Sequence, residues 1–259
     1  NFGISQAKGE WIAFVDSDDW VEQTYIETLI ADNDGSDICF VNTVQEKRTV
    51  LQTEALSLNE NSFHLYERCL LNKYVLKEHP HLTSVWAKLY KKNFLLQYKI
   101  KFPEDLKKSE DAIFNMQAYS NAKRGKWSRV GLYNYRPNAY SVTHTFDSTV
   151  VETYKKHLRY VKEFYKEKSY SEFDSDYAVR VTFDFIYCIV NDFCHYQNHE
   201  NYIKRKKNFS FVKNDIMFKE SIENVKVKRF SIEEQILILM IKRNMFWIIN
   251  LVVRIIQKI

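Results

Sequence analysis

Residues 11–19 read Trp11-Ile12-Ala13-Phe14-Val15-Asp16-Ser17-Asp18-Asp19, a short apolar run that passes directly into three carboxylates. A continuous apolar run that ends abruptly in acid predicts a strand buried on both faces of a sheet. In open α/β sheets, ligands bind beyond the carboxyl ends of the strands. We therefore expect the acidic cluster, Asp16 to Asp19, to lie at a ligand-binding edge of an α/β fold.

The acidic cluster has two interpretations. Three carboxylates within four residues repel one another unless a cation or hydrogen-bond donors compensate them. Alternate residues of an extended chain share a face, which lets Asp16 and Asp18 converge. Hard oxygen ligands beside a phosphate-bearing substrate suit Mg²⁺ or Mn²⁺. The competing interpretation is a solvated acidic turn before a helix at Trp20, and the cluster alone does not separate the two.

Strand and helix patterns alternate outward from this segment. Further strands are expected at 37–41, 84–90 and 127–136, and helices at 21–30, 63–75, 93–98 and 110–121. Such alternation favours an α/β body with a mixed sheet flanked by helices. All five glycines and all three prolines lie before residue 138, and a segment without these breakers favours helix. The remainder should therefore be mostly helical, with helices at 149–168, 172–195 and 232–259.

The composition is that of a globular protein, with 45% hydrophobic and 27% charged residues in 259. The four cysteines show no C-x-x-C spacing, so we expect buried, reduced thiols in a cytoplasmic protein. The net charge is +5, and residues 201–259 hold 13 Lys and Arg against 5 Asp and Glu. The rest of the chain is therefore net acidic, which argues against a nucleic-acid-binding body. We expect two domains, 1–146 and 147–259.

Glu110-Asp111 is a second candidate for chemistry. Ser109 is a residue type that caps helices, and a cap there places both acids in the first helical turn. The helix dipole favours anions at that position, so stabilisation of the helix start explains the pair without a function. The functional interpretation is a general base that takes a proton from an acceptor hydroxyl.

A third candidate is Tyr133-Asn134-Tyr135-Arg136, followed by Ser141. An arginine at a strand end with hydroxyl groups nearby can bind a diphosphate. An ordinary surface arginine is the alternative explanation for Arg136.

Four segments taken together resemble the bacterial glycosyltransferase family 2, whose members have the GT-A fold. Residues 1–20 are similar to the family's N-x-G-x-x-x-A-x-G-x-(apolar strand)-D-x-D-D segment, and residues 84–90 to its acceptor-side strand. Ser109-Glu110-Asp111 looks like its helix start, and Tyr135-Arg136 with Ser141 like its donor-closing segment. A lone D-x-D motif is weak, but four segments in the family's order across residues 1–146 are specific.

The resemblance implies an inverting glycosyltransferase that moves a sugar from a nucleotide-diphosphate donor, a UDP-sugar, to a hydroxyl group. The acceptor would be a saccharide or lipid-linked saccharide in cell-surface polysaccharide synthesis. Asp18 and Asp16 would hold Mg²⁺ or Mn²⁺, and Asp111 would be the base. The positions carried over for the donor are Asn1, Gly3, Asp16, Asp18, Asp19, Arg136 and Ser141, and those for the acceptor are Trp86, Lys88 and Glu110.

Members of this family begin with two or three strands that hold uracil and ribose, whereas Asn1-Phe2-Gly3 falls in the middle of the family's motif. We therefore expect these N-terminal strands to be missing from the given chain, and the isolated 259-residue polypeptide to be inactive. The alternative function is a non-catalytic, membrane-associated binding or scaffold module built on a decayed or truncated transferase fold.

Residues 231–259 contain two apolar runs separated by Lys242-Arg243. Neither approaches the roughly 18 residues needed to span a bilayer. Amphipathic helices with basic residues beside Trp and Ile lie in membrane interfaces, and the basic clusters at 204–207 and 226–229 would attract anionic lipid. We expect a cytoplasmic protein, peripheral on the inner face of the plasma membrane. The alternative is a tail packed on the catalytic body or in a dimer, and the oligomeric state stays open.

Overall fold

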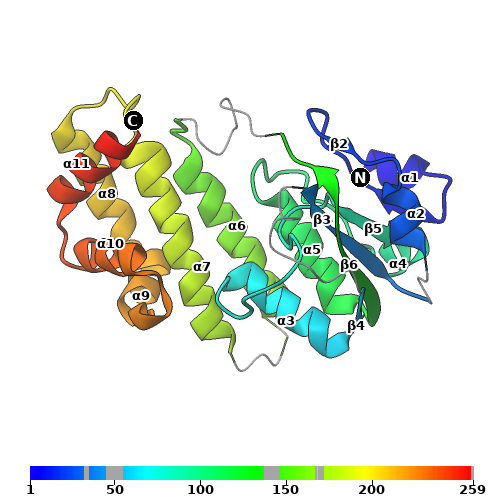
Figure 1. The fold of residues 1–259 in the computed structure, drawn as a ribbon. Helices are drawn as coiled ribbons and strands as arrows, with labels where there is room; N and C mark the ends of the chain where they lie inside the picture. Colours follow the sequence, from blue (N-terminus) through cyan, green and yellow to red (C-terminus); the bar gives the residue numbers. More distant parts are fainter. Residues whose placement is uncertain (32–34, 45–54, 137–145, 167, 169–171, 258–259) are drawn as a thin grey trace. The chain divides into compact units, whose positions relative to one another are not determined.

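The computed structural model describes residues 1–31, 35–44, 55–136, 146–166, 168 and 172–257. The chain forms two compact units, which we call the sheet unit (residues 1–137) and the helical unit (residues 138–259) (Figure 1). Strands β1 to β6 and helices α1 to α5 belong to the first, and helices α6 to α11 to the second. The predicted α/β body and the predicted helical C-terminal region are therefore confirmed.

The sheet is mixed. Its strands are β1 (Trp11–Ala13), β2 (Trp20–Val21), β3 (Ile38–Thr43), β4 (Leu56–Asn59), β5 (Lys88–Lys91) and β6 (Arg124–Asn134). They lie in the order β1-β5-β3-β6-β2, and β4 also pairs with β6. Strands β3 and β6 run parallel, and the other pairs are antiparallel. A parallel pair needs a crossover connection, which the long segment between β3 and β6 supplies.

Strand β3 is the centre of the sheet unit, and all six of its residues are buried. The ring of Phe40 packs near Phe63 on helix α3 and Tyr119 on helix α5, with centroids 6.3 and 6.1 Å away. On β6, a Cβ atom at Gly125 would lie 2.6 Å from both the Ile38 carbonyl and the Phe63 ring. Only glycine allows the two parallel strands and the helix to approach this closely.

Among its described residues, the sheet unit has the helices α1 (Phe2–Gln6), α2 (Tyr25–Ile30), α3 (Glu60–Leu71), α4 (Lys92–Gln97) and α5 (Glu110–Asn121). Helix α5 has the predicted bounds. Helix α3 begins earlier than predicted because Asn59 and Ser62 form a capping box, in which Asn59 Oδ1 accepts a hydrogen bond from the Ser62 N–H.

Two predictions for the first thirty residues are wrong. Strand β1 ends at Ala13 and is not buried on both faces, because it is the end strand of the described sheet and Val15 beyond it is 47% exposed. The helix expected from Val21 begins later, because Val21 pairs with Tyr133 in the β2–β6 ladder. Periodicity alone did not distinguish a two-residue strand followed by a short helix from one longer helix.

The helical unit is built from α6 (Val150–Tyr165), α7 (Phe173–Cys188), the π-helical turn η2 (Ile189–Phe193), α8 (Tyr202–Lys213), α9 (Ile216–Asn224), the 3₁₀ turn η3 (Val227–Arg229), α10 (Ile232–Lys242) and α11 (Phe246–Ile256). Its core is rich in phenylalanine. Phe185 lies 5.6 Å from Phe209 and 5.4 Å from Phe218, centroid to centroid. These contacts join α7, α8 and α9.

The C-terminal residues form two helices, not the single helix predicted for 232–259. The break falls at Asn244, whose φ of 57° no α-helix tolerates. Ile241, Ile249 and Val253 are buried in the core of the helical unit, so α10 and α11 are integral parts of that unit. Within the described residues, no helix has the length and apolar character needed to cross a bilayer.

Candidate active site

The acidic cluster forms a turn between β1 and β2. The Asp19 N–H donates to the Asp16 carbonyl at 3.1 Å, and Trp20 then enters β2 opposite Asn134 of β6. Only Phe14 and Val15 separate the end of edge strand β1 from the cluster, so the carboxylates follow its carboxyl end, as predicted. The predicted helix at Trp20 is absent, because this residue is in a strand.

Tyr133 organises this turn. Its hydroxyl donates to Asp19 Oδ2 at 2.6 Å and accepts from the Asp16 N–H at 3.2 Å. The other Asp19 oxygen, Oδ1, accepts from the Arg136 N–H at 2.8 Å. Both oxygens of Asp19 are therefore engaged in protein contacts, while the side chains of Asp16 and Asp18 are exposed. Asp19 anchors the turn, and the other two carboxylates stay available.

The three carboxylates are mutually unfavourable. Partial burial raises the pKa of Asp16, and the negative charges of Asp19 and Asp18 raise it further. Burial also raises the pKa of Tyr133 far above its ordinary value, so the phenol keeps its proton and remains a donor to Asp19. A turn of this kind is stabilised by a cation.

Aromatic side chains line the neighbouring surface. Trp86 stacks on Tyr133 with centroids 4.7 Å apart and an interplanar angle of 13°, and on Tyr135 at 5.9 Å and 22°. The His81 ring lies 4.7 Å from Trp86 on another side. Trp86 thus connects the loop before β5 to the strand that holds the acidic turn.

Lys88, an expected acceptor-binding residue, is fully buried. Its Nζ donates to the carbonyls of His81, Ser84 and, at 3.3 Å, Trp86. Burial lowers the pKa of Lys88 to about 7, against the attraction of the Asp111 carboxylate. The ammonium group therefore points into the loop at 81–86 and fixes the shape of that loop.

Asp111 lies in the first turn of α5 and accepts a hydrogen bond from the Val85 N–H at 3.2 Å. Burial raises the pKa of Asp111 to about 6; the Val85 hydrogen bond and Lys88 lower it, whereas Glu110 and Asp16 raise it. The ring of Phe14, two residues before Asp16, packs against Phe114 on α5 with centroids 5.8 Å apart, so the two sequence candidates, 95 residues apart along the chain, lie on neighbouring segments. A carboxylate with a perturbed pKa beside a second acidic group is a usual feature of catalytic sites.

The N-cap of α5 differs from expectation. Ser109 occupies the capping position, but its φ of 63° is left-handed and its side chain makes no capping hydrogen bond. The left-handed backbone of Ser109 therefore sets the direction in which α5 begins, and with it the positions of Glu110 and Asp111.

The remaining predicted residues are placed as follows. The Asn1 side chain donates to the Phe102 carbonyl and accepts from the Phe102 N–H, both at 2.9 Å. Gly3 lies in α1 with open space around its Cα. The guanidinium of Arg136 is 5.3 Å from the Trp20 ring centroid, and Ser141 lies outside the described residues. The roles proposed for these four residues stay predictions.

Sequence reasoning missed two contributors. Tyr133 was noted only as a neighbour of Arg136, and the Val85 backbone was not considered. The signal for Tyr133 was its position near the end of a predicted strand, three residues before Arg136. No residue type identifies a backbone donor such as Val85, so that contact needed the structure.

The residues fit a small divalent cation without forming a closed cage. Within the described ranges, no group of three or more His, Cys, Asp or Glu side chains is arranged as a metal site. Mg²⁺ is usually held by one or two carboxylates together with substrate phosphates and water. The exposed carboxylates of Asp16 and Asp18 meet that requirement, because they repel each other and Asp19 is already engaged.

Comparison with known proteins identifies glycosyltransferases similar to the chain. Residues 1–94 match the family model "Glycosyl transferase family 2". The chain is 24% identical to EpsH of Bacillus subtilis (strain 168), which is provisionally named a glycosyltransferase, over 95% of the chain and 72% of EpsH. It is 31% identical over 126 residues to TarS of Staphylococcus aureus (strain MW2), a poly(ribitol-phosphate) beta-N-acetylglucosaminyltransferase, covering 48% of the chain and 20% of TarS.

The fold is shared with a solved structure. The crystal structure of S. aureus TarS 1–349 in complex with UDP-GlcNAc superposes with a TM-score of 0.56 at 20% identity, over 96% of this chain and 68% of that one. The chain therefore shares the GT-A fold of TarS, with an acidic turn at the end of a strand of the mixed sheet. The chain is similar to glycosyltransferase family 2, whose model its residues 1–94 match.

Proposed function

We propose that the protein transfers a sugar from a UDP-sugar to a hydroxyl group of a saccharide or lipid-linked saccharide, with inversion at the anomeric carbon. The observation that carries this proposal is the stacking of Trp86 on Tyr133, because Tyr133 holds Asp19 of the acidic turn and the neighbouring Val85 N–H holds Asp111. It joins a half-buried carboxylate fit to act as a base to an exposed acidic turn fit to hold a donor diphosphate.

The donor end of the site is the turn at Asp16 to Asp19. Asp16 and Asp18 would hold Mg²⁺ or Mn²⁺, which neutralises the charge of a leaving nucleoside diphosphate. Asp19 contributes by fixing the turn through Tyr133 and the Arg136 N–H. A UDP-sugar is the favoured donor class because TarS, which shares the fold, was crystallised with UDP-GlcNAc.

The acceptor end is Asp111. Its carboxylate would take the proton from the acceptor hydroxyl as that oxygen bonds to the anomeric carbon, while the carbon–oxygen bond to the diphosphate breaks on the opposite face. A positioned base contributes roughly 10²–10⁴ in rate. With a pKa of about 6, Asp111 is ionised near neutral pH, so we expect kcat/KM to fall as the pH drops below about 6.

Two residues expected at the acceptor receive different roles. Lys88 has its ammonium group on three backbone carbonyls, so we assign it to positioning: it shapes the loop whose Val85 N–H holds Asp111. Trp86 is partly exposed and stacked, and it keeps the proposed role of a platform for the acceptor sugar, with Glu110 beside Asp111.

The proposed acceptor is a cell-surface polysaccharide or its lipid-linked precursor. Support comes from TarS, whose name gives poly(ribitol-phosphate) as its acceptor. The chain spans 42% of a further relative, the uncharacterized glycosyltransferase EpsJ of B. subtilis (strain 168), at 32% identity. The activity and the acceptor of the whole protein are therefore proposals.

We further propose that the helical unit lies against the inner face of the plasma membrane. The helices of this unit pack against one another, yet they leave large apolar side chains on the surface. Ile203 and Phe211 on α8 are 78% and 75% exposed, and Trp247 on α11 is 61% exposed. Lys206 and Lys207 are exposed on α8. Arg205, counted in the basic cluster from the sequence, is buried and donates to the Phe193 carbonyl, so it takes no part.

The experiment that tests the transferase proposal uses the full-length protein, a panel of UDP-sugars with Mn²⁺, and detection of released UDP. We expect turnover with one or more UDP-sugars, and a loss of 10²–10⁴-fold in kcat for Asp111→Asn. Asp18→Asn should raise the Mn²⁺ concentration needed for half-maximal rate. Glu27→Gln, an exposed substitution on α2, is the matched control and should leave both quantities unchanged. Full activity in Asp111→Asn would refute the assignment of the base and favour a non-catalytic module.

A further inference from the structure

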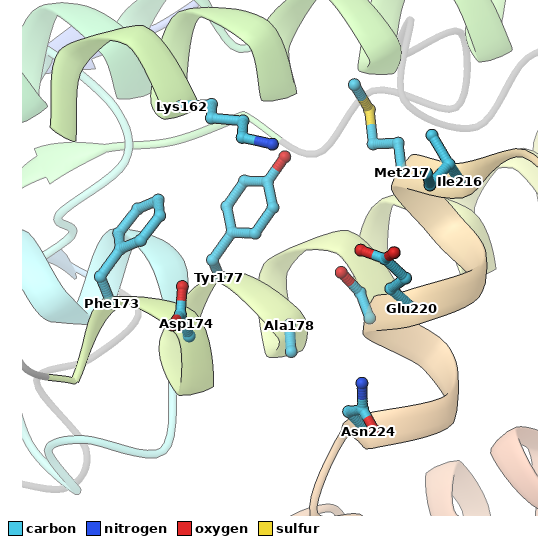
Figure 2. A pocket seen from close by; sticks show the side chains of 10 residues that line it. Lys162, Phe173, Asp174, Tyr177, Ala178, Ile216, Met217, Glu220 and Asn224 are labelled. Carbon is cyan, nitrogen blue, oxygen red and sulfur yellow. The ribbon is translucent and has the colours of Figure 1, made fainter. Parts of the chain in front are cut away.

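The helical unit contains a cleft of its own. It has a volume of about 530 Å³ and lies between helices α6, α7 and α9 (Figure 2). Pockets that hold small ligands have volumes of roughly 300–1,000 Å³. None of the chemistry proposed above uses this cleft, because the acidic turn and Asp111 belong to the sheet unit.

One wall of the cleft is aromatic. Phe173 and Tyr177 lie one turn apart on α7, and their rings stack with centroids 5.2 Å apart at an interplanar angle of 25°. Both side chains are half-buried, so they present ring surface to the cleft while remaining fixed. Such a surface packs well against the C–H face of a sugar ring, which is apolar although the rim of the ring carries hydroxyl groups.

The opposite side and the rim are polar. Glu220 and Asn224 face the gap from α9, Asp174 lies beside the aromatic pair on α7, and Lys162 reaches in from α6 (Figure 2). Within the described residues, Lys162, Asp174 and Glu220 form no ion pair. Carboxylates, an amide and an ammonium group that converge without pairing offer several acceptors and donors to one ligand.

The hydroxyl of Tyr177 needs an explanation. Its oxygen is shielded from solvent and has no hydrogen-bond partner among the described residues. An unpaired buried hydroxyl costs stability of roughly 1–3 kcal/mol, and it is uncommon in folded proteins. Burial raises the pKa of Tyr177 to about 12, so the group stays a neutral phenol that can both donate and accept. Figure 2 shows the end of Lys162 beside this hydroxyl, so displacement of that flexible side chain would expose the phenol to a ligand hydroxyl.

We propose that this cleft is a saccharide-binding site that holds a segment of the acceptor chain apart from the point of transfer. The cleft favours a neutral polyhydroxylated ligand. Its carboxylates, Asp174 and Glu220, outnumber the single ammonium group of Lys162, and this net negative charge disfavours phosphate. The inference rests on the proposed function for the identity of the chain as an acceptor, but binding itself does not require transfer. A second contact on the same chain raises the effective concentration of its growing end at the sheet unit.

The test measures binding of neutral hexasaccharides to the full-length protein by saturation-transfer NMR and titration calorimetry. The probes are the β-1,4-linked hexamer of N-acetylglucosamine and the α-1,4-linked hexamer of glucose, with inorganic phosphate as an anionic probe. We expect at least one hexamer to bind. Tyr177→Ala should weaken that binding by tenfold or more, and Tyr177→Phe and Glu220→Gln by roughly three- to tenfold.

Glu223→Gln is the matched control, since Glu223 is exposed on the same helix α9 but does not line the cleft. The Glu223→Gln variant should bind the hexasaccharides with the same affinity as the unmodified protein. Tyr177→Phe guards against misfolding, because it removes an unpaired hydroxyl and should leave the melting temperature unchanged or higher. The proposal is overturned if neither hexamer binds at millimolar concentration, if binding survives Tyr177→Ala, or if phosphate competes for the cleft.

Failure of this inference and failure of the proposed function are distinguishable. Asp111→Asn should abolish transfer and leave hexasaccharide binding intact. Tyr177→Ala should keep transfer to a monosaccharide acceptor and lose the preference for long acceptors. Hexasaccharide binding without any UDP-sugar turnover would refute the transferase proposal alone, and turnover without such binding would refute the cleft alone.

Discussion

The carboxylate of Asp184 in the helical unit lies between two cations or potential cations, 3.2 Å from His157 Nδ1 and 2.8 Å from Arg180 Nη2. The carboxylate of Asp111 in the sheet unit has one hydrogen bond from a backbone N–H within the described residues, and acidic neighbours in Glu110 and Asp16. Both side chains are withdrawn from water, but Asp184 has two ion-pair partners, whereas Asp111 has one backbone donor and the weaker attraction of Lys88 against two acidic neighbours.

The two carboxylates therefore serve different purposes: Asp184 stabilises the fold, and Asp111 is suited to proton transfer. A buried charge with matched partners costs little in the folded state and holds elements together, as Asp184 does between α6 and α7. A charge left short of partners has a shifted pKa and is ready to exchange a proton. Removing one charge should therefore have opposite effects on stability in the two units.

The largest effect is expected in the helical unit. Asp184→Ala leaves Arg180 and His157 without their shared partner in a buried position, and breaking a buried pair costs about 3–5 kcal/mol. Urea unfolding followed by circular dichroism should show this loss as a lower midpoint. The kcat of the fraction that remains folded should be unchanged, and a loss below about 1 kcal/mol would mean that the pair is not structural.

The Asp111→Asn substitution is expected to raise the free energy of unfolding, whereas Asp184→Ala lowers it. The folded-state pKa of Asp111 is raised to about 6 from an ordinary 3.8, so the folded protein holds this proton more tightly than the unfolded chain does. The associated stability is present below about pH 4 and is lost as the pH rises to 6. The substitution should therefore stabilise by on the order of 2 kcal/mol at pH 7.5 and by nearly nothing at pH 4. Equal effects at both pH values would contradict the assignment.

A smaller effect is expected for Tyr133→Phe. This change keeps the ring stacked on Trp86 and removes the hydroxyl that bonds Asp19 and the Asp16 N–H. Loss of a hydrogen bond to a charged group is worth about 1.5–3 kcal/mol. UDP binding in the presence of Mn²⁺, measured by calorimetry on the full-length protein, should weaken roughly tenfold. Tyr25→Phe is the control and should bind UDP normally, because the Tyr25 hydroxyl donates to the Lys88 carbonyl and not to the acidic turn.

The smallest effect concerns surface charge. Lys206→Gln with Lys207→Gln should weaken co-sedimentation with phosphatidylserine vesicles, because each basic residue near an anionic surface contributes about 1 kcal/mol. The same pair of changes in the sheet unit, Lys107→Gln with Lys123→Gln, should have no effect. Equal losses from both pairs would indicate a general attraction by net charge. Deleting α10 and α11 is a poor substitute, since both contribute to the core of the helical unit.

The sequence predicted what depends on local pattern. The bounds of α5 followed from Ser109 as a capping residue type before Glu110, and the order of four motif segments indicated the family. It did not predict the burial of Lys88, because lysine is almost never fully buried and its three partners are backbone carbonyls without a residue signature. Nor did it predict the Tyr133–Asp19 bond, which joins residues 114 positions apart.

Strand β6 has a consequence for how the protein is made. It hydrogen-bonds to β2, β3 and β4, all of which leave the ribosome long before it does. At roughly 5–20 residues per second, the apolar residues of β3 wait about 5–20 seconds for their parallel partner. During synthesis the nascent chain therefore carries an open strand edge on β3, a template for pairing with other chains. Slow translation between residues 44 and 134 should lower the soluble yield, and binding of a chaperone in that interval should restore it.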